Sequence, residues 1–313
     1  ESMLRDITKK IAQIRDSMEK QQEQAKKSAA GASINVKKEG IGQVVIAGMP
    51  NSGKSTLLKQ LTNANVEIAD YPFTTTKPEI GMMNYKNAWI QIVEIPAIVE
   101  GSSEGKANGI QLFSIIRNAD AVILIYRNEE EKKTLLEEFK KSNITLNGKK
   151  PEVEIRNSQF KGITIAGKQH LKVKEEQLID FLKSMGMLNA EVVLKEPTDL
   201  EKIAEVIEEK IVYKQAVVFN PFEKYDFEEL KTKIFYLLGK IMVYTKKHGD
   251  EADLQQTMVL EKNCNIEDAA KGLHKDFASG IKYAKVWGSA KFPGQRVAKD
   301  YCLQDGDIIE FTI

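Results

Sequence analysis

Nine consecutive residues carry the clearest chemistry in this sequence: Gly48-Met49-Pro50-Asn51-Ser52-Gly53-Lys54-Ser55-Thr56. They match the pattern of a phosphate-binding loop, in which glycines let successive backbone N–H groups curl around a β-phosphate. Lys54 would place positive charge against the β- and γ-phosphates, and the Ser55 hydroxyl would coordinate Mg²⁺. The loop follows an apolar segment and opens a helix-forming one, as such loops require. We expect these residues to bind nucleotide phosphates: Gly48, Asn51, Ser52, Gly53, Lys54, Ser55 and Thr56.

Two threonines downstream could sense the γ-phosphate. Thr74 and Thr75 lie in the run Tyr71-Pro72-Phe73-Thr74-Thr75-Thr76. A threonine hydroxyl there can complete the Mg²⁺ shell while its backbone N–H meets the γ-phosphate. The alternative is a threonine-rich loop that only leads into a strand. The intact phosphate loop favours the sensor, with Thr75 as a metal ligand.

The overall composition limits the classes of partner and the cellular compartments that we expect. The 46 lysines and arginines balance 45 aspartates and glutamates, so the net charge gives no argument for a nucleic acid or a membrane as partner. Cys264 and Cys302 lack the spacing of a zinc site or a disulfide framework. No apolar run approaches the ~20 residues of a membrane helix, and no secretory leader is recognisable. We expect a cytoplasmic protein without a membrane span.

The order of the predicted elements indicates an α/β fold. Strands are expected at residues 44–47, 80–85, 88–93, 121–126 and 217–219, and helices at 55–61, 110–118 and 227–238. This alternation predicts a mainly parallel sheet with helices on both faces. Leu4, Ile7, Ile11, Ile14 and Met18 predict an amphipathic N-terminal helix, which either packs within the protein or docks on a partner.

Two further α/β regions are expected. The first has strands at 153–155, 162–165 and 190–194 and helices at 175–185 and 200–210. The second has strands at 241–244, 258–260, 283–287 and 308–313 and a helix at 266–277. Two strands, a helix and then further strands are typical of a β-grasp domain. The first region we interpret as an insertion into the nucleotide-binding domain.

Three segments, residues 48–58, 69–75 (Ala-Asp-Tyr-Pro-Phe-Thr-Thr) and 95–101 (Ile-Pro-Ala-Ile-Val-Glu-Gly), together resemble the Obg-related GTPases. The developmentally regulated GTP-binding protein branch is similar over nearly the full length. The resemblance implies an N-terminal helical region (1–40), a GTPase domain (41–143 and 213–242), a ribosomal-protein-S5-like α/β insert (144–212) and a TGS domain (243–313). It also implies GTP and GDP as ligands, and the ribosome, RNA or translation factors as partners of the TGS domain or N-terminal helix.

The third motif of that family departs from its usual form. The family has Asp-x-Pro-Gly, whereas this chain has Glu94-Ile95-Pro96-Ala97. Glu94 keeps the charge that holds a Mg²⁺-bound water, and Ala97 keeps the N–H that meets the γ-phosphate. Ile98 stands where Ras-like GTPases carry a water-orienting glutamine, so hydrolysis needs help from elsewhere. Asn51 resembles the potassium ligand of other GTPases, with a loop-capping role as the alternative. The candidate catalytic residues are therefore Lys54, Thr75 and Asn51.

The base-reading motif is the largest departure. The family uses Asn-Lys-x-Asp, and after residues 217–219 this chain has Asn220-Pro221-Phe222-Glu223. In one alignment Asn220 and Glu223 read the guanine and Pro221 covers it. In a second alignment the motif is missing, and a plain turn is a third interpretation. Two functions follow: a slow, Mg²⁺-dependent GTPase switch, or a degenerate relative that acts as a ribosome- or RNA-binding adaptor.

Overall fold

The computed structural model describes residues 36–63, 66–68, 78–207, 211–247, 257–273 and 280–312. The predicted N-terminal helix and the two threonines, Thr74 and Thr75, lie outside these residues. Three sheets organise the described chain, with seven, five and three strands.

The seven-stranded sheet contains β1 (Gln43–Gly48), the strand that leads into the predicted phosphate loop. Its order is β2 (Val66–Ile68), β3 (Glu79–Tyr85), β4 (Ala88–Glu94), β1, β5 (Ala121–Ile125), β10 (Val212–Phe219) and β6 (Ile144–Leu146). The five strands from β4 to β6 are parallel, and β2 and β3 join antiparallel at one edge. The mainly parallel sheet is as predicted. The antiparallel hairpin turns at Lys86 and Asn87, both with positive φ.

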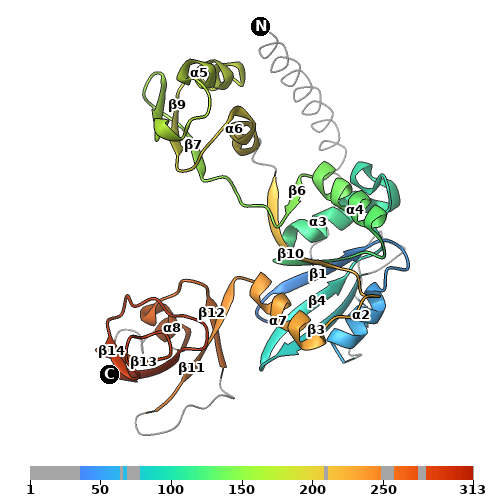
Figure 1. Cartoon of the computed structure of the whole chain (residues 1–313), viewed down its shortest axis with the longest axis vertical. Helices are drawn as coiled ribbons and strands as arrows, with labels where there is room; N and C mark the ends of the chain where they lie inside the picture. Colours follow the sequence, from blue (N-terminus) through green and yellow to red (C-terminus); the bar gives the residue numbers. More distant parts are fainter. Residues whose placement is uncertain are drawn as a thin grey trace. The chain divides into compact units, whose positions relative to one another are not determined.

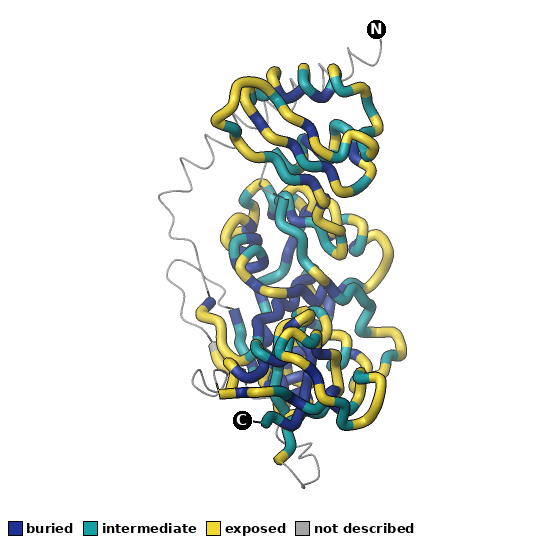
Figure 2. Tube along the Cα trace, turned by 90° about the vertical axis from the view of Figure 1, so that its left-hand side faces the viewer, coloured by how far each residue is buried: buried dark blue, intermediate teal, exposed yellow. Residues whose placement is uncertain are grey.

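Helices cover both faces of this sheet, as predicted (Figure 1). On one face α2 (Lys54–Leu61) and α7 (Phe227–Leu237) share a core that includes Leu57, Leu61 and Phe235 with the strand residues Ile46 and Ile123. The alternate residues of β1 and β5 face the other way, where α3 (Gly109–Asn118) and α4 (Glu129–Lys141) lie. Every residue of β1 is therefore buried. Figure 2 draws the buried residues of the described chain in dark blue.

Helix α4 is an element that the sequence patterns did not predict. Its first turn is Glu129-Glu130-Glu131, and the side chain of Asn128 caps it by accepting a hydrogen bond from the Glu131 N–H. Only a narrow stripe with Leu135 and Phe139 faces the core, so the charged residues mask its periodicity. The ring of Phe139 packs edge-on against Phe113 of α3, with 5.5 Å between the ring centres.

The inserted region forms the three-stranded sheet. Its order is β7 (Val153–Asn157), β9 (Ala190–Leu194) and β8 (Ile163–Ala166), and α5 (Glu175–Ser184) and α6 (Leu200–Ile207) belong to the same region. Because β6 and β10 lie in the seven-stranded sheet, we propose that the insertion spans about residues 147–211 rather than 144–212.

In the C-terminal region, the described residues form the five-stranded sheet and the helix α8 (Ile266–Leu273). The order is β12 (Thr257–Glu261), β11 (Lys240–Thr245), β15 (Ile308–Thr312), β13 (Tyr283–Trp287) and β14 (Gln295–Val297). Helix α8 packs on one face, with Ile266 and Ala269 against Val243, Ala284 and Val286. This mixed sheet with a helix packed on one face is the predicted β-grasp arrangement. Cys264 is buried, Cys302 is exposed, and both are free thiols. Across the described residues, no helix is long and apolar enough to span a bilayer.

Candidate nucleotide-binding site

The phosphate loop connects β1 to α2 at the carboxyl end of the central strand. Gly53, at φ 92°, is the residue before the helix, a conformation that favours glycine. A Cβ at Gly48 would lie 2.6 Å from the carbonyl oxygen of Ile125, so this glycine lets the loop pass close to β5. Ser52 is fully buried, and its hydroxyl donates to the Met49 carbonyl at 2.8 Å. Hydrogen bonds within the loop thus hold its conformation. The N-terminus of α2 follows directly, and helix N-termini favour bound anions such as phosphate.

Lys54 lies inside the loop. Its Nζ donates to the carbonyl oxygens of Met49 at 2.9 Å and Gly48 at 3.3 Å, and the residue is only 7% exposed. Burial lowers the pKa of its ammonium group, and the charge of Glu94 partly offsets this effect. A lysine ammonium group held by the loop can form charge-assisted hydrogen bonds to the oxygens of a bound phosphate.

Ser55 and Glu94 meet beside Lys54, although 39 residues separate them in the chain. The Ser55 hydroxyl donates to Oε1 of Glu94 at 2.7 Å. The other oxygen, Oε2, is buried and has no hydrogen-bond partner among the described residues. Burial raises the pKa of Glu94, with the Ser55 hydrogen bond opposing it. A carboxylate with one unsatisfied oxygen beside a serine hydroxyl is a donor set that fits Mg²⁺. Thr56 is exposed in the first turn of α2.

The segment after Glu94 continues alongside β1 as far as the start of the phosphate loop. The Ile98 N–H donates to the Gly48 carbonyl at 3.1 Å, and the Ile95 N–H to Ile46 at 3.3 Å. Ala97 is half-buried between them. The Ile98 side chain is fully buried, so it belongs to the core rather than to the nucleotide.

Glu138 of α4 holds the continuation of this segment in place, a role that no sequence pattern indicated. Its carboxylate accepts from the backbone N–H of Gly101 at 3.0 Å and of Ser103 at 2.7 Å, and the residue is 1% exposed. Burial by itself would raise the pKa of Glu138, but those N–H groups and the Lys141 charge hold it below its ordinary value. Helix α4 therefore anchors the loop that leads away from Glu94.

The predicted base-reading residues follow β10 directly and lie beside the phosphate loop. A Cβ built on Gly53 would lie 3.4 Å from Cγ of Pro221. The Asn220 amide nitrogen donates to the Arg127 carbonyl at 3.1 Å and to Oε1 of Glu223 at 3.0 Å. This placement favours the alignment in which Asn220-Pro221-Phe222-Glu223 replaces the base-reading motif.

Sequence comparisons agree with this architecture. Residues 43–158 match the model of the 50S ribosome-binding GTPase family, and residues 241–313 match the TGS domain. An uncharacterized GTP-binding protein of Methanocaldococcus jannaschii is 33% identical over 97% of this chain and 87% of its own length. Developmentally-regulated GTP-binding protein 2 of Homo sapiens is 30% identical over 91% of this chain and 86% of its own. This chain belongs to the developmentally regulated GTP-binding protein family.

The family fold explains which predicted residues meet. The P-loop GTPase sheet brings Gly48, Ser52, Gly53, Lys54 and Ser55 together with Glu94 from the end of β4. Asn51, at φ 58°, is exposed at the tip of the loop. Thr74 and Thr75 stay predictions, because they lie outside the described residues.

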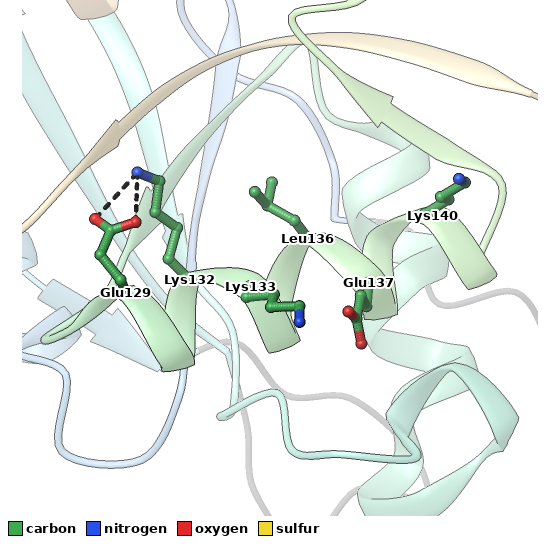
Figure 3. Close-up of a pocket in the computed structure, with 6 residues that line it drawn as sticks. All are labelled: Glu129, Lys132, Lys133, Leu136, Glu137 and Lys140. Carbon is green, nitrogen blue, oxygen red and sulfur yellow. Dashed lines mark hydrogen bonds and ion pairs between the residues drawn. The ribbon is translucent and has the colours of Figure 1, made fainter.

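A shallow hollow on the outer side of α4 is separate from this constellation. Its lining residues all come from that helix: Glu129, Lys132, Lys133, Leu136, Glu137 and Lys140 (Figure 3). Lys132 is paired with Glu129 at 3.1 Å. The hollow contains none of the predicted nucleotide-binding residues, and its mixed charge is that of a solvated helix face.

Proposed function

We propose that this member of the family is a Mg²⁺-dependent GTP-binding switch of the cytoplasm that hydrolyses GTP slowly. The observation that carries the proposal is the Ser55–Glu94 pair beside the buried Lys54, at the opening of the phosphate loop. The loop N–H groups and Lys54 would hold the phosphates of GTP or GDP. Ser55 and Glu94 would hold Mg²⁺, which neutralises phosphate charge when it is bound.

Slow turnover follows from the buried isoleucine at position 98. An alkyl side chain inside the core can neither accept from nor donate to an attacking water. We assign catalytic assistance to Lys54, to Thr75 as a γ-phosphate sensor, and to Asn51 as a ligand of K⁺. The Ala97 N–H would be the γ-phosphate contact on the opposite side.

The test is a set of affinities and rates on the full chain. We expect GTP and GDP to bind in a Mg²⁺-dependent way, ATP and ADP to bind less tightly, and single-turnover GTP hydrolysis to be faster in K⁺ than in Na⁺. Absence of nucleotide binding at millimolar concentration would refute the switch. Equal rates in the two salts would remove the potassium role of Asn51 alone.

A second candidate function is an adaptor that binds RNA or the ribosome, and one surface favours it. The face of the five-stranded sheet opposite α8 carries Tyr283, Lys285 and Trp287, because Ala284 and Val286 point into the core. The Arg296 guanidinium lies 3.7 Å from the Tyr283 ring centre, and Lys246 Nζ lies 4.0 Å from that of Trp287. Aromatic rings paired with cations on a sheet suit stacked bases and their phosphates.

Direct binding measurements distinguish the two functions. Binding of a fluorescent single-stranded RNA should weaken about tenfold in Trp287→Ala, and it should fall with rising salt. Trp89→Ala, at the other tryptophan, is the matched control and should bind as the unmodified protein does. If the affinity for RNA or the ribosome is the same with GTP, with GDP and without nucleotide, the adaptor is favoured over the switch.

A further inference from the structure

We infer that Phe222 is the residue that stacks on the nucleotide base in this protein. Pro221, which stands at the position of the family's lysine, lies against Gly53 of the phosphate loop instead. The inference rests on the proposed function, because it concerns the base of the nucleotide whose phosphates the loop binds. It assigns the affinity for the base to an aromatic ring and leaves the choice of guanine to Glu223.

The first argument is position. The loop after β10 lies against the phosphate loop: a Cβ on Gly53 would be 3.4 Å from Pro221 and 3.8 Å from Cζ of Phe222. Strand β10 pairs with β5, which pairs with β1, so their carboxyl ends share one edge of the sheet. Ligands of such sheets lie outside that edge. A base attached to phosphates at Gly53 therefore reaches this loop.

The second argument is exposure. Phe222 is 66% exposed, although a phenyl ring is ordinarily buried. Its neighbours Glu223 and Lys224 are also exposed, so the ring does not contribute to a hydrophobic core there. A planar apolar surface held next to a phosphate site is the group that covers the face of a nucleobase.

The third argument is rigidity. The Asn220 side chain accepts from the Phe222 N–H at 3.0 Å, and the Glu223 N–H donates to the Asn220 carbonyl at 3.3 Å. Further along, the Tyr225 hydroxyl donates to Gln60 of α2 at 3.4 Å, and its ring packs edge-on against Phe219. These contacts hold the backbone of the loop at both ends, so less backbone entropy is lost when the Phe222 ring stacks on a base.

Phe222 and Glu223 would have different roles in binding the base. A phenyl ring stacks on any purine and does not tell guanine from adenine. Glu223 carries a carboxylate, held by the Asn220 amide at 3.0 Å, and a carboxylate accepts from the N1 and N2 hydrogens that guanine alone presents together. The ring therefore supplies affinity, and the carboxylate supplies selectivity.

The experiment measures the affinities of GTP, ATP and inorganic tripolyphosphate for the full chain by calorimetry. Phe222→Ala should weaken GTP and ATP by the same factor, about tenfold, and leave tripolyphosphate unchanged. Glu223→Gln should weaken GTP by about tenfold and spare ATP. Phe222→Trp should keep GTP affinity, and its indole fluorescence should be quenched when nucleotide binds.

Phe292→Ala is the matched control, because Phe292 is an equally exposed phenylalanine (61%) in the TGS domain. It should change none of the three affinities. Unchanged GTP affinity in Phe222→Ala would overturn the inference while the switch stands. A parallel loss of tripolyphosphate would also overturn it, since the variant would then act on the phosphate loop. No binding of any nucleotide by the unmodified protein would instead refute the proposed function.

Discussion

The hydroxyl of Ser55 donates a hydrogen bond of 2.7 Å to Oε1 of Glu94, which links the start of α2 to the end of β4. The aspartate of the family's third motif is one methylene shorter. The longer glutamate side chain makes this hydrogen bond to the serine because β4 pairs directly with β1, which brings position 94 opposite Ile46. The contact between the two residues proposed to hold Mg²⁺ is therefore retained despite the substitution.

Glu94→Gln should weaken nucleotide binding and stabilise the protein. Burial raises the pKa of Glu94, so its folded pKa lies above the unfolded value. The folded state then holds the proton more tightly, and stability falls as pH rises from the unfolded pKa through the folded one. At pH 7 without Mg²⁺ the amide should raise the melting temperature by a few degrees, and this gain should vanish below about pH 4.

The same variant should lose the Mg²⁺ dependence of GTP binding. Glu100→Gln, at an exposed position, is its control and should change neither property. A melting temperature that drops at pH 7 in Glu94→Gln would show that the ionised carboxylate stabilises the site instead.

Lys54→Met should abolish tight triphosphate binding without unfolding the loop. Methionine keeps most of the buried stem but removes the charge, and loss of a buried cation from an ionic contact costs roughly 100-fold in affinity. Lys59→Met, on the exposed side of the same helix, should bind GTP normally. A retained GTP affinity in Lys54→Met, measured by calorimetry, would mean that the phosphates bind elsewhere.

Glu138→Ala should loosen the loop after Glu94. It leaves two partly buried backbone N–H groups, of Gly101 and Ser103, without their acceptor, which should cost about 2–4 kcal/mol in urea unfolding. The pKa of Glu138 is depressed, so the contribution is present at neutral pH and is lost as pH falls through the folded pKa. Glu137→Ala, the exposed neighbour, should stay within about 0.5 kcal/mol, and an equal effect of both would contradict the anchoring role.

Tyr236→Phe should weaken the contact between α7 and the TGS domain. The Tyr236 hydroxyl donates to Asp305 at 2.6 Å, and this hydrogen bond raises the pKa of Tyr236 to about 12. The loss should be about 1 kcal/mol at neutral pH, and the contribution should fade only as pH rises from about 10 toward 12. Tyr225→Phe, whose bond to Gln60 is 3.4 Å long, should cost less. Similar losses would show no special role for the Asp305 contact.

Much of the fold follows from local patterns. The buried strands at 44–47 and 121–126 and the helix at 110–118 match β1, β5 and α3 within one or two residues, because unbroken apolar runs and helical periodicity are local signals. Helix α4 was missed, since its charged residues outnumber the apolar ones. The short strands β2 and β14 were missed because three residues carry no periodicity.

The candidate site likewise has features that the local sequence predicts and features that only the tertiary structure shows. The sequence by itself determined the phosphate loop, because Gly48, Gly53, Lys54 and Ser55 act through the conformation of one continuous segment. Only the tertiary structure decided that Ile98 is buried, that Glu138 anchors the loop after Glu94, and that Phe222 lies beside Gly53. Those contacts join residues far apart in the chain, and the order of strands in the sheet, which no local pattern encodes, brings them together.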